Sequence, residues 1–165
     1  MSTQAVIAFI NLDDTVRYVD LVNDGDLAGD ILLNHYNNYS AAQAVTSGGV
    51  ISTLRPQLQD CMFHALNWGR EKRETVTTVE VLFGLADIIA AASDDYYPCP
   101  VYVFDGREYH DDYVLTEHFH YHKMYGTPIN DVNPNKDKQY WKQLNADGTL
   151  HPIHESENVM VWRSV

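Results

Sequence analysis

The stretch "QAVIAFINLDDTVRYVDLV", residues 4–22, decides the fold. Residues 4–10 form an apolar run with high strand propensity, and residues 16–22 form a second strand-prone run. The polar "LDDT" between them is typical of a turn. Two such runs joined by a short turn predict an antiparallel hairpin at the start of the chain.

A loop rich in aspartate and glycine, "NDGDLAGD", follows the predicted hairpin. Asp24 and Gly25 favour a turn, and residues 28–38 carry apolar side chains at helical spacing, which predicts a helix. Asp26 or Asp30 is expected to cap this helix and to complement its dipole, because carboxylates accept hydrogen bonds from the N–H groups of a first turn.

Two kinds of ligand site are excluded for this loop. An EF-hand centred on Gly25 would put Val22 and Ile31 at positions where calcium needs oxygen ligands. The glycine spacing does not match the dinucleotide-binding motif, and the aspartates would repel a pyrophosphate. The sequence therefore predicts a structural turn whose carboxylates remain on the surface.

The middle of the chain predicts further mixed structure. Residues 40–48 predict a second helix with the serine as its N-cap and glycines at its end. Residues 60–68 fit a strand or a helix equally well. Residues 75–95 read as strand-prone residues that run into an amphipathic helix, with Thr77 or Thr78 as its cap.

The stretch "VYVFDGREYHDDYVLT" alternates about an Asp-Gly pair and predicts a second hairpin, with strands at 100–104 and 107–115. We therefore expect an α+β fold, a mainly antiparallel sheet with two or three helices on one face. Residues 1–123 are expected to form this core domain. Residues 124–165 are expected to form an irregular C-terminal extension that ends in a strand and packs on the core.

The acidic net charge of the chain limits the kinds of partner that it can bind. The 165 residues carry 23 acidic and 11 basic side chains, a formal net charge of -12. Such a surface repels nucleic-acid phosphates, so no direct DNA or RNA binding is expected, and it attracts basic protein surfaces. No apolar run reaches the roughly 18 residues of a membrane span, and the N-terminus lacks the basic region of a signal peptide. We expect a soluble cytoplasmic protein without membrane contact, whose Cys61 and Cys99 stay reduced.

Two acidic segments are interleaved with tyrosines, a composition that suits a protein interface, since tyrosine provides contact area and carboxylates complement Arg and Lys. A solvated face with half-buried tyrosines is the alternative. The residues predicted to bind a partner are Asp24, Asp26, Asp30, Asp94, Asp95, Tyr96, Tyr97, Asp111 and Asp112.

The segment "EHFHYHK" is the candidate metal site. In a strand, His118, His120 and His122 would share one face and could ligate Zn²⁺ or another divalent transition metal, with His110 as a further ligand. In a helix they would point apart. Three close imidazoles also suit a pH-sensitive element. No nucleophile motif or distinctive carboxylate pair occurs, so no catalytic residue is predicted and no other cofactor is expected.

Three segments carry a family resemblance: "LLNHYNN" at 32–38, "FHALNWGREKRE" at 63–74 and "VYVFDGREY" at 101–109. With the opening hairpin, their order resembles a group of small uncharacterised bacteriophage and bacterial proteins over residues 1–115. Members typically carry a His-Trp-Asp-Gly-Tyr-Pro loop followed by an "LLEHY" helix. This chain keeps Asp24 and Gly25 but lacks the flanking His-Trp and Tyr-Pro. The resemblance favours a strand at 60–68 and implies a phage-encoded accessory protein.

The leading hypothesis is a small acidic phage-type protein that binds and inhibits a basic host or defence protein in the bacterial cell. Its partner would normally bind nucleic acid, so the acidic surface would act as a DNA mimic. The alternatives are a metal-binding protein or small metal-dependent enzyme that uses the three histidines, and a virion or assembly component that self-associates into a homo-oligomer.

Overall fold

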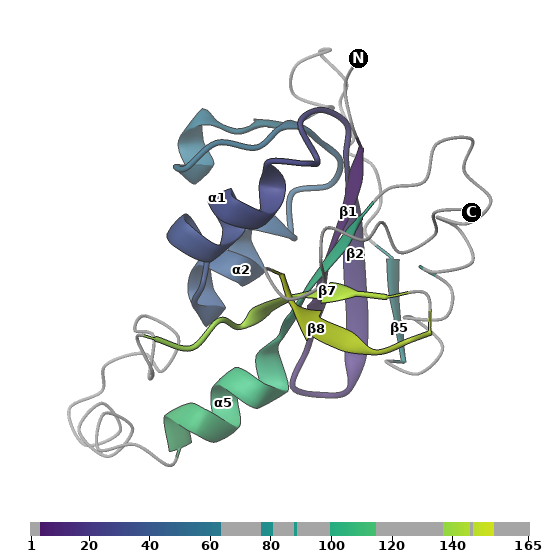
Figure 1. Cartoon of the computed structure of the whole chain (residues 1–165), viewed down its shortest axis with the longest axis vertical. Helices are drawn as coiled ribbons and strands as arrows, with labels where there is room; N and C mark the ends of the chain where they lie inside the picture. The colour runs from purple at the N-terminus through teal and green to yellow at the C-terminus, as the bar shows by residue number, and fades with distance from the viewer. Residues whose placement is uncertain are drawn as a thin grey trace.

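The structure is a computed structural model of the chain, and it describes residues 4–63, 77–80, 88, 100–114, 137–145 and 147–153. Its strands form one mixed sheet in the order β4-β3-β2-β1-β6-β7-β8, with β5 paired to β2 beside β3 (Figure 1). The strands are β1 (Ala5–Ile10), β2 (Thr15–Leu21), β3 (Ile51–Thr53), β4 (Met62–Phe63), β5 (Thr77–Glu80), β6 (Val101–Asp105), β7 (Trp141–Leu144) and β8 (Leu150–Pro152).

Most strand pairs are antiparallel, which confirms the predicted fold class. The exceptions are the parallel pairs β1–β6 and β2–β3. The predicted hairpin at 4–22 is present, since β1 and β2 pair antiparallel over their full length. In residues 60–68, Asp60 ends a short 3-10 helix, Met62 and Phe63 form β4 as the strand prediction requires, and residues 64–68 lie outside the described residues.

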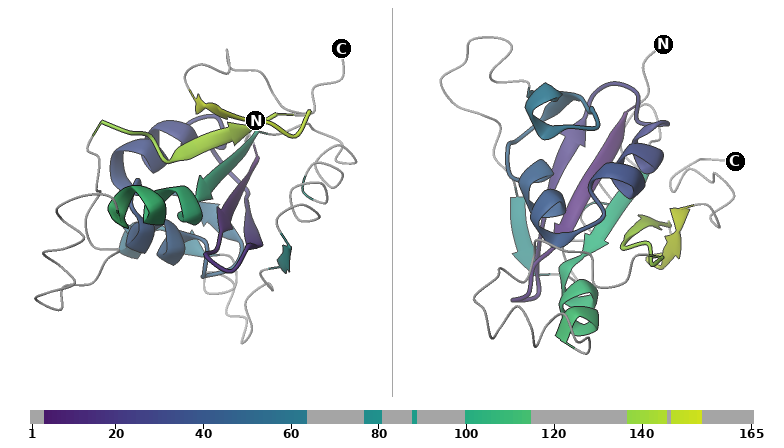
Figure 2. Two further views of the ribbon diagram at one scale, coloured as in Figure 1. Left: turned by 90° about the horizontal axis from the view of Figure 1, so that it is seen from below. Right: turned by 90° about the vertical axis from the view of Figure 1, so that its left-hand side faces the viewer.

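The described helices are α1 (Ala28–His35), α2 (Tyr39–Val45), the short 3-10 helix η1 (Leu58–Asp60) and α5 (Gly106–Val114). Both α1 and α2 cover one face of the sheet (Figure 2). Side chains of α5 join the same apolar cluster at one end of the sheet. None of the helices in the described ranges has the length and apolar character of a membrane span.

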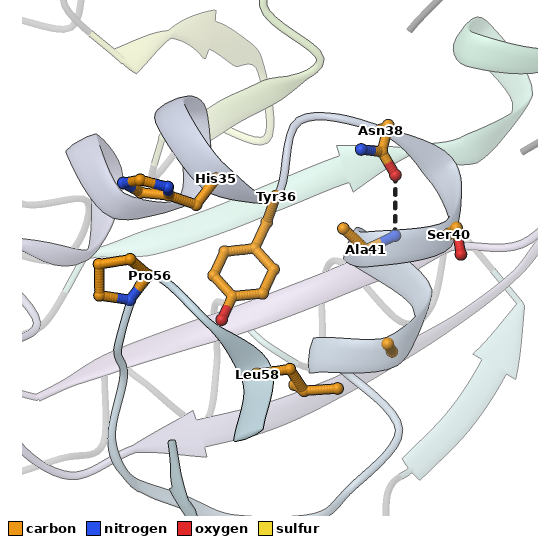
Figure 3. A pocket seen from close by; sticks show the side chains of 8 residues that line it. His35, Tyr36, Asn38, Ser40, Ala41, Pro56 and Leu58 are labelled. Carbon is orange, nitrogen blue, oxygen red and sulfur yellow. Dashed lines mark hydrogen bonds between the residues drawn. The ribbon is translucent and has the colours of Figure 1, made fainter. Parts of the chain in front are cut away.

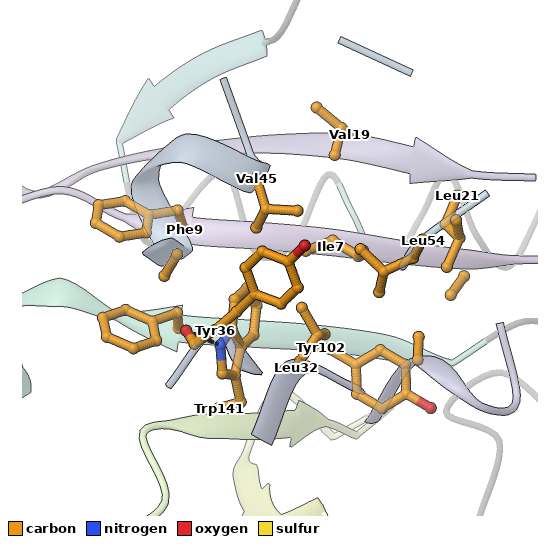
Figure 4. Packing of buried hydrophobic residues seen from close by; sticks show 14 of the residues in the cluster. Ile7, Phe9, Val19, Leu21, Leu32, Tyr36, Val45, Leu54, Tyr102 and Trp141 are labelled. Atoms are coloured by element: carbon orange, nitrogen blue, oxygen red, sulfur yellow. Dashed lines mark hydrogen bonds between the residues drawn. The ribbon is translucent and has the colours of Figure 1, made fainter. Parts of the chain in front are cut away.

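The main core lies between this face of the sheet and the helices. Ile7 of β1, Leu32 of α1 and Trp141 of β7 are fully buried there, and Figure 4 shows the cluster gathered over the central strands. The Trp141 indole donates to the backbone oxygen of Tyr36 at 2.8 Å, so the aromatic core also fixes the end of α1. Because β1 is buried on both faces, its continuous apolar run is the pattern of a central strand.

The opposite face of the sheet carries a second apolar cluster. Val6 and Ala8 of β1 contribute to it with Val103 of β6. Ile88, which is helical and 1% exposed, packs against them. The position of Ile88 agrees with the predicted helix within 75–95, and residues 81–87 and 89–95 lie outside the described part of the chain.

The predicted strand at 107–115 is wrong, because these residues form α5. The Asp105 carboxylate accepts hydrogen bonds from the backbone N–H groups of Arg107 and Glu108 at 3.0 and 3.4 Å, which starts a helix where a hairpin turn was expected. Tyr109 and Tyr113 lie one helical turn apart and are buried together. Residues four apart share a face in a strand as well as in a helix, so the spacing of these tyrosines did not distinguish the two structures.

The predicted helix caps are also wrong. Leu27 is the N-cap of α1 without a side-chain bond, so Asp30 contributes only as a charge in the first turn. At α2 the side-chain oxygen of Asn38 accepts from the backbone at 2.9 Å, which places Ser40 inside the helix. Thr77, an expected cap, lies in β5.

Two hairpin turns share one sequence pattern, Asn-x-Asp-x-Thr, at residues 11–15 and 145–149. In both, the third-position aspartate accepts bonds from the backbone N–H and the hydroxyl of the fifth-position threonine. The fourth residue has positive φ, 65° for Asp14 and 86° for Gly148. The second turn joins β7 to β8, so part of the 124–165 segment belongs to the sheet. The predicted domain boundary stays a prediction.

Candidate functional site

The described residues predicted to bind a partner lie at opposite ends of the sheet. The Asp24–Asp30 segment follows Leu21, which pairs with Ala5 at the start of β1. The helix α5 follows Asp105, which pairs with Ile10 at the end of β1. A six-residue strand spans about 17 Å, so Asp24, Asp26 and Asp30 do not meet the aspartates of α5.

The first end is a rigid turn with exposed carboxylates. Asp24 adopts a φ of 61°, a conformation that aspartate tolerates better than most side chains. Gly25 is buried, and a Cβ there would collide with the backbone oxygen of Gln4. The Gly25 carbonyl also accepts from the hydroxyl of Tyr102 at 3.2 Å. The backbone that carries these exposed aspartates is therefore held against the start of β1.

The second end is organised around Arg107 of α5. Its guanidinium donates to both carboxylate oxygens of Asp105 at 3.0 Å, and to Asp14 of the first turn at 3.0 Å. The hydrogen bond to Asp105 is the main reason that the pKa of Arg107 is raised. This cation therefore joins β6 to the β1–β2 turn.

The outer part of α5 is bound to the segment that enters β7. Lys138 contacts Glu108 at 2.8 Å and Asp112 at 2.7 Å, and Lys142 contacts Glu108 at 2.7 Å. The buried Tyr140 donates its hydroxyl to Asp112 at 3.0 Å. Burial alone would lower the pKa of Lys138, but its hydrogen bonds to Asp112 and Glu108 raise that pKa above its ordinary value.

The neighbouring aspartates of α5 thus have different roles. Asp112 is bonded to the strand segment, whereas the Asp111 side chain is 80% exposed and lies 3.9 Å from the imidazole of His110. Of the two predicted partner-binding residues in this helix, Asp111 alone presents its carboxylate mainly to solvent.

Basic groups of the described segments are mostly engaged by this chain. Arg107, Lys138 and Lys142 are in ion pairs. Arg17 lies 4.7 Å from the Phe9 ring centroid and donates to an oxygen in α2, and burial lowers its pKa. The exposed carboxylates belong to Asp13, Asp14, Asp20, Asp24, Asp26, Asp30, Asp60, Asp111, Asp137 and Asp147.

Several predicted site residues lie outside the described residues. These are the acidic-aromatic group Asp94, Asp95, Tyr96 and Tyr97, and the candidate metal ligands His118, His120 and His122. Within the described ranges, no group of three or more His, Cys, Asp or Glu side chains is arranged to hold a metal ion. The metal hypothesis therefore stays a prediction.

A pocket that sequence reasoning did not predict lies where α1 ends and α2 begins. Its volume is about 360 Å³, and we call it the α1–α2 pocket. Figure 3 shows His35 and Pro56 on one side, Asn38 and Ser40 on the other, and Leu58 below. The lining residues are His35, Tyr36, Asn38, Ser40, Ala41, Ala44, Pro56 and Leu58. The sequence indicated only that two helices follow each other closely at this point of the chain, which is where the pocket forms.

The wall of this pocket is fixed by Tyr36. Its hydroxyl donates to the backbone oxygen of Arg55 at 2.6 Å and lies 3.4 Å from the sulfur of Cys61. Burial is the main cause of its raised pKa, followed by Cys61 and the negative charge of Asp60. The phenol is therefore a neutral hydrogen-bond donor that ties the 55–61 segment to α1.

The chain matches no protein-family model, no curated protein and no solved structure.

Proposed function

We propose that this protein binds a positively charged surface of another protein and blocks it, in the manner of a DNA mimic. The observation that carries the proposal is that basic side chains in the described part of the chain are paired with its own carboxylates, whereas many other carboxylates are exposed. Arg107, Lys138 and Lys142 are in ion pairs with carboxylates of the same chain, among them the exposed Asp14, and nine further aspartates of the described residues have exposed side chains. The net charge of -12 extends this excess to the whole chain.

Physical chemistry supports a basic partner over nucleic acid. An excess of carboxylates repels phosphates and accelerates encounter with a surface rich in lysine and arginine. Such a surface is typical of nucleic-acid-binding proteins. The resemblance to phage proteins supports a host or defence protein of the bacterial cell as the target, and inhibition as the outcome.

The test begins with capture of partners from a nuclease-treated bacterial lysate at low and high salt. The captured protein is then purified and its binding is measured against duplex DNA as a competitor. The proposal requires a basic partner whose affinity falls as salt rises and which DNA displaces. Binding that neither salt nor DNA weakens would contradict it.

The two acidic ends provide matched variants for this test. Asp24→Asn with Asp26→Asn removes two charges from one end, and Asp13→Asn with Asp111→Asn removes two charges from the other. An exposed charge pair is worth about 0.2–1 kcal/mol, so each double variant is expected to weaken binding by roughly twofold to thirtyfold if its end contacts the partner. Equal loss from both sets would indicate a non-specific charge effect and not a docking face.

A further inference from the structure

We propose that Asp147–Gly148 is a modification site, where the chain converts the aspartate to isoaspartate through a succinimide. The pair lies in the turn between β7 and β8, and both residues are exposed. This inference goes beyond the proposed function, because it depends only on the chemistry of the turn and not on a partner.

The reaction needs no group outside the pair except water. The backbone nitrogen of Gly148 attacks the side-chain carboxyl carbon of Asp147, a C–N bond forms, and the carboxyl hydroxyl leaves as water with the amide proton. Water then opens the five-membered ring. Opening at the former main-chain carbonyl leaves the chain running through the side-chain carbon, which is isoaspartate. A glycine in the second position favours ring closure, because it has no Cβ beside the attacking nitrogen and its backbone rotates freely.

The other two Asp-Gly pairs of the chain are confined by the fold. Gly25 is buried, and a Cβ there would collide with the backbone oxygen of Gln4. Gly106 is also buried, and Arg107 holds the carboxylate of Asp105 through two hydrogen bonds of 3.0 Å. Ring closure rotates the peptide group between the two residues of a pair, and close packing resists that rotation.

Gly148 is not confined in this way. No atom of the described residues, apart from its chain neighbours, lies within 4 Å of the position that a Cβ would take there. Its N–H donates to the backbone oxygen of Asn145 at 2.9 Å, and the carboxylate of Asp147 accepts from the N–H and the hydroxyl of Thr149 at 3.0 and 2.6 Å. Water replaces such surface bonds at little cost, so they slow ring closure without preventing it. Isoaspartate adds one carbon to the main chain, so the product loses these bonds and the turn loosens.

The equivalent turn at residues 11–15 is an internal control. The carboxylate of Asp13 accepts the same backbone and hydroxyl hydrogen bonds as that of Asp147. The next residue is Asp14, at a φ of 65°, and its side chain shields the backbone nitrogen that would attack. Gly148→Asp therefore gives the second turn the unreactive pair of the first, in a backbone conformation that aspartate tolerates.

The test is incubation of the whole protein at 37 °C and pH 6, followed by peptide mapping with mass spectrometry. Methyl transfer from S-adenosylmethionine by protein isoaspartyl methyltransferase identifies the peptides that contain isoaspartate. We expect isoaspartate at position 147 to form at least about tenfold faster than at positions 24 and 105, because those pairs react only when the fold opens locally. Equal rates at the three positions, or a faster reaction at 24 or 105, would overturn the proposal.

Two controls separate the effect of the fold from that of the sequence. In guanidinium chloride, where the chain is unfolded, the three Asp-Gly pairs are expected to react at similar rates. The same preference for position 147 in the unfolded chain would overturn the proposal. In the folded protein, Gly148→Asp is expected to abolish the product at position 147 and to leave the slow reactions at 24 and 105 unchanged. An unchanged rate at position 147 in this variant would also overturn the proposal.

Discussion

Asp111 and Asp112 are adjacent residues of one helix, and the structure predicts opposite consequences when each is changed to alanine. Asp112→Ala removes the contacts with Lys138 at 2.7 Å and with the Tyr140 hydroxyl at 3.0 Å. Asp111→Ala removes a side chain that is 80% exposed. The pair is therefore a controlled test of which carboxylate holds the fold and which remains for a partner.

The magnitude follows from those contacts. A partly exposed ion pair contributes about 0.2–1 kcal/mol, and a hydrogen bond to a charged acceptor contributes about 1.5–3 kcal/mol. Since Tyr140 is buried, its hydroxyl would lose a partner that water replaces poorly. We expect Asp112→Ala to lower the free energy of unfolding by about 2 kcal/mol, which is about 4–8 °C in melting temperature for a chain of this size.

Thermal and urea unfolding measure the effect, with Asp111→Ala as the control. Asp111→Ala is expected to stay within about 0.5 kcal/mol of the unchanged protein. In partner binding the order reverses, and Asp111→Ala is expected to weaken affinity about twofold to fivefold. Equal stability of the two variants would refute the assignment of Asp112 to the internal network.

Three further predictions concern turns and close contacts. Gly148→Val should lower the free energy of unfolding by about 1–2 kcal/mol, because valine is strained at a φ of 86°, and Gly148→Asn should lower it by less, because asparagine tolerates a positive φ as Asp14 does in the equivalent turn. Urea unfolding compares the two variants, and equal effects would contradict the shared geometry. Gly106→Ala should lower the free energy of unfolding by about 1–3 kcal/mol in the same assay, because the new Cβ would lie 2.6 Å from the backbone oxygen of Ile10 at the end of β1. An unchanged free energy of unfolding would mean that α5 starts elsewhere. Hydrogen bonds from Thr15 and Thr149, above all from their hydroxyls, lower the pKa of Asp13 and Asp147 below the ordinary 3.8. The stabilisation that these carboxylates provide is therefore present above pH 3.8 and is lost as the pH falls through their folded-state pKa values. Below pH 3.8 the melting temperature of the Asp13→Asn/Asp147→Asn variant should fall less steeply with pH than that of the unchanged protein, and the same steepness in both would refute this.

Local sequence was sufficient for the parts of the fold that depend on neighbouring residues. The hairpin at 4–22 was predictable because its two strands and its turn are contiguous. The strand-like segment 138–144 and the turn residues that follow it in the sequence correspond to β7 and to the turn between β7 and β8. The shared Asn-x-Asp-x-Thr pattern was also available in the sequence, and it marks both turns.

The remaining features depend on residues far apart in the chain. The parallel pairing of β6 with β1 has no local signal, and without it the Asp-Gly pair at 105–106 resembles a hairpin turn. Asp111 and Asp112 are equivalent in sequence, and only the approach of Lys138 and Tyr140 distinguishes them. The acidic residues of the two ends were grouped by composition, whereas strand register separates them.

The central claim is that exposed carboxylates of this chain dock on the basic surface of a nucleic-acid-binding protein. The most direct measurement is the dissociation constant of the purified, captured partner as a function of salt, repeated with duplex DNA present. The account predicts a steep loss of affinity with rising salt and complete displacement by DNA. An affinity that is independent of salt, with DNA and this protein bound to the partner at the same time, would contradict it.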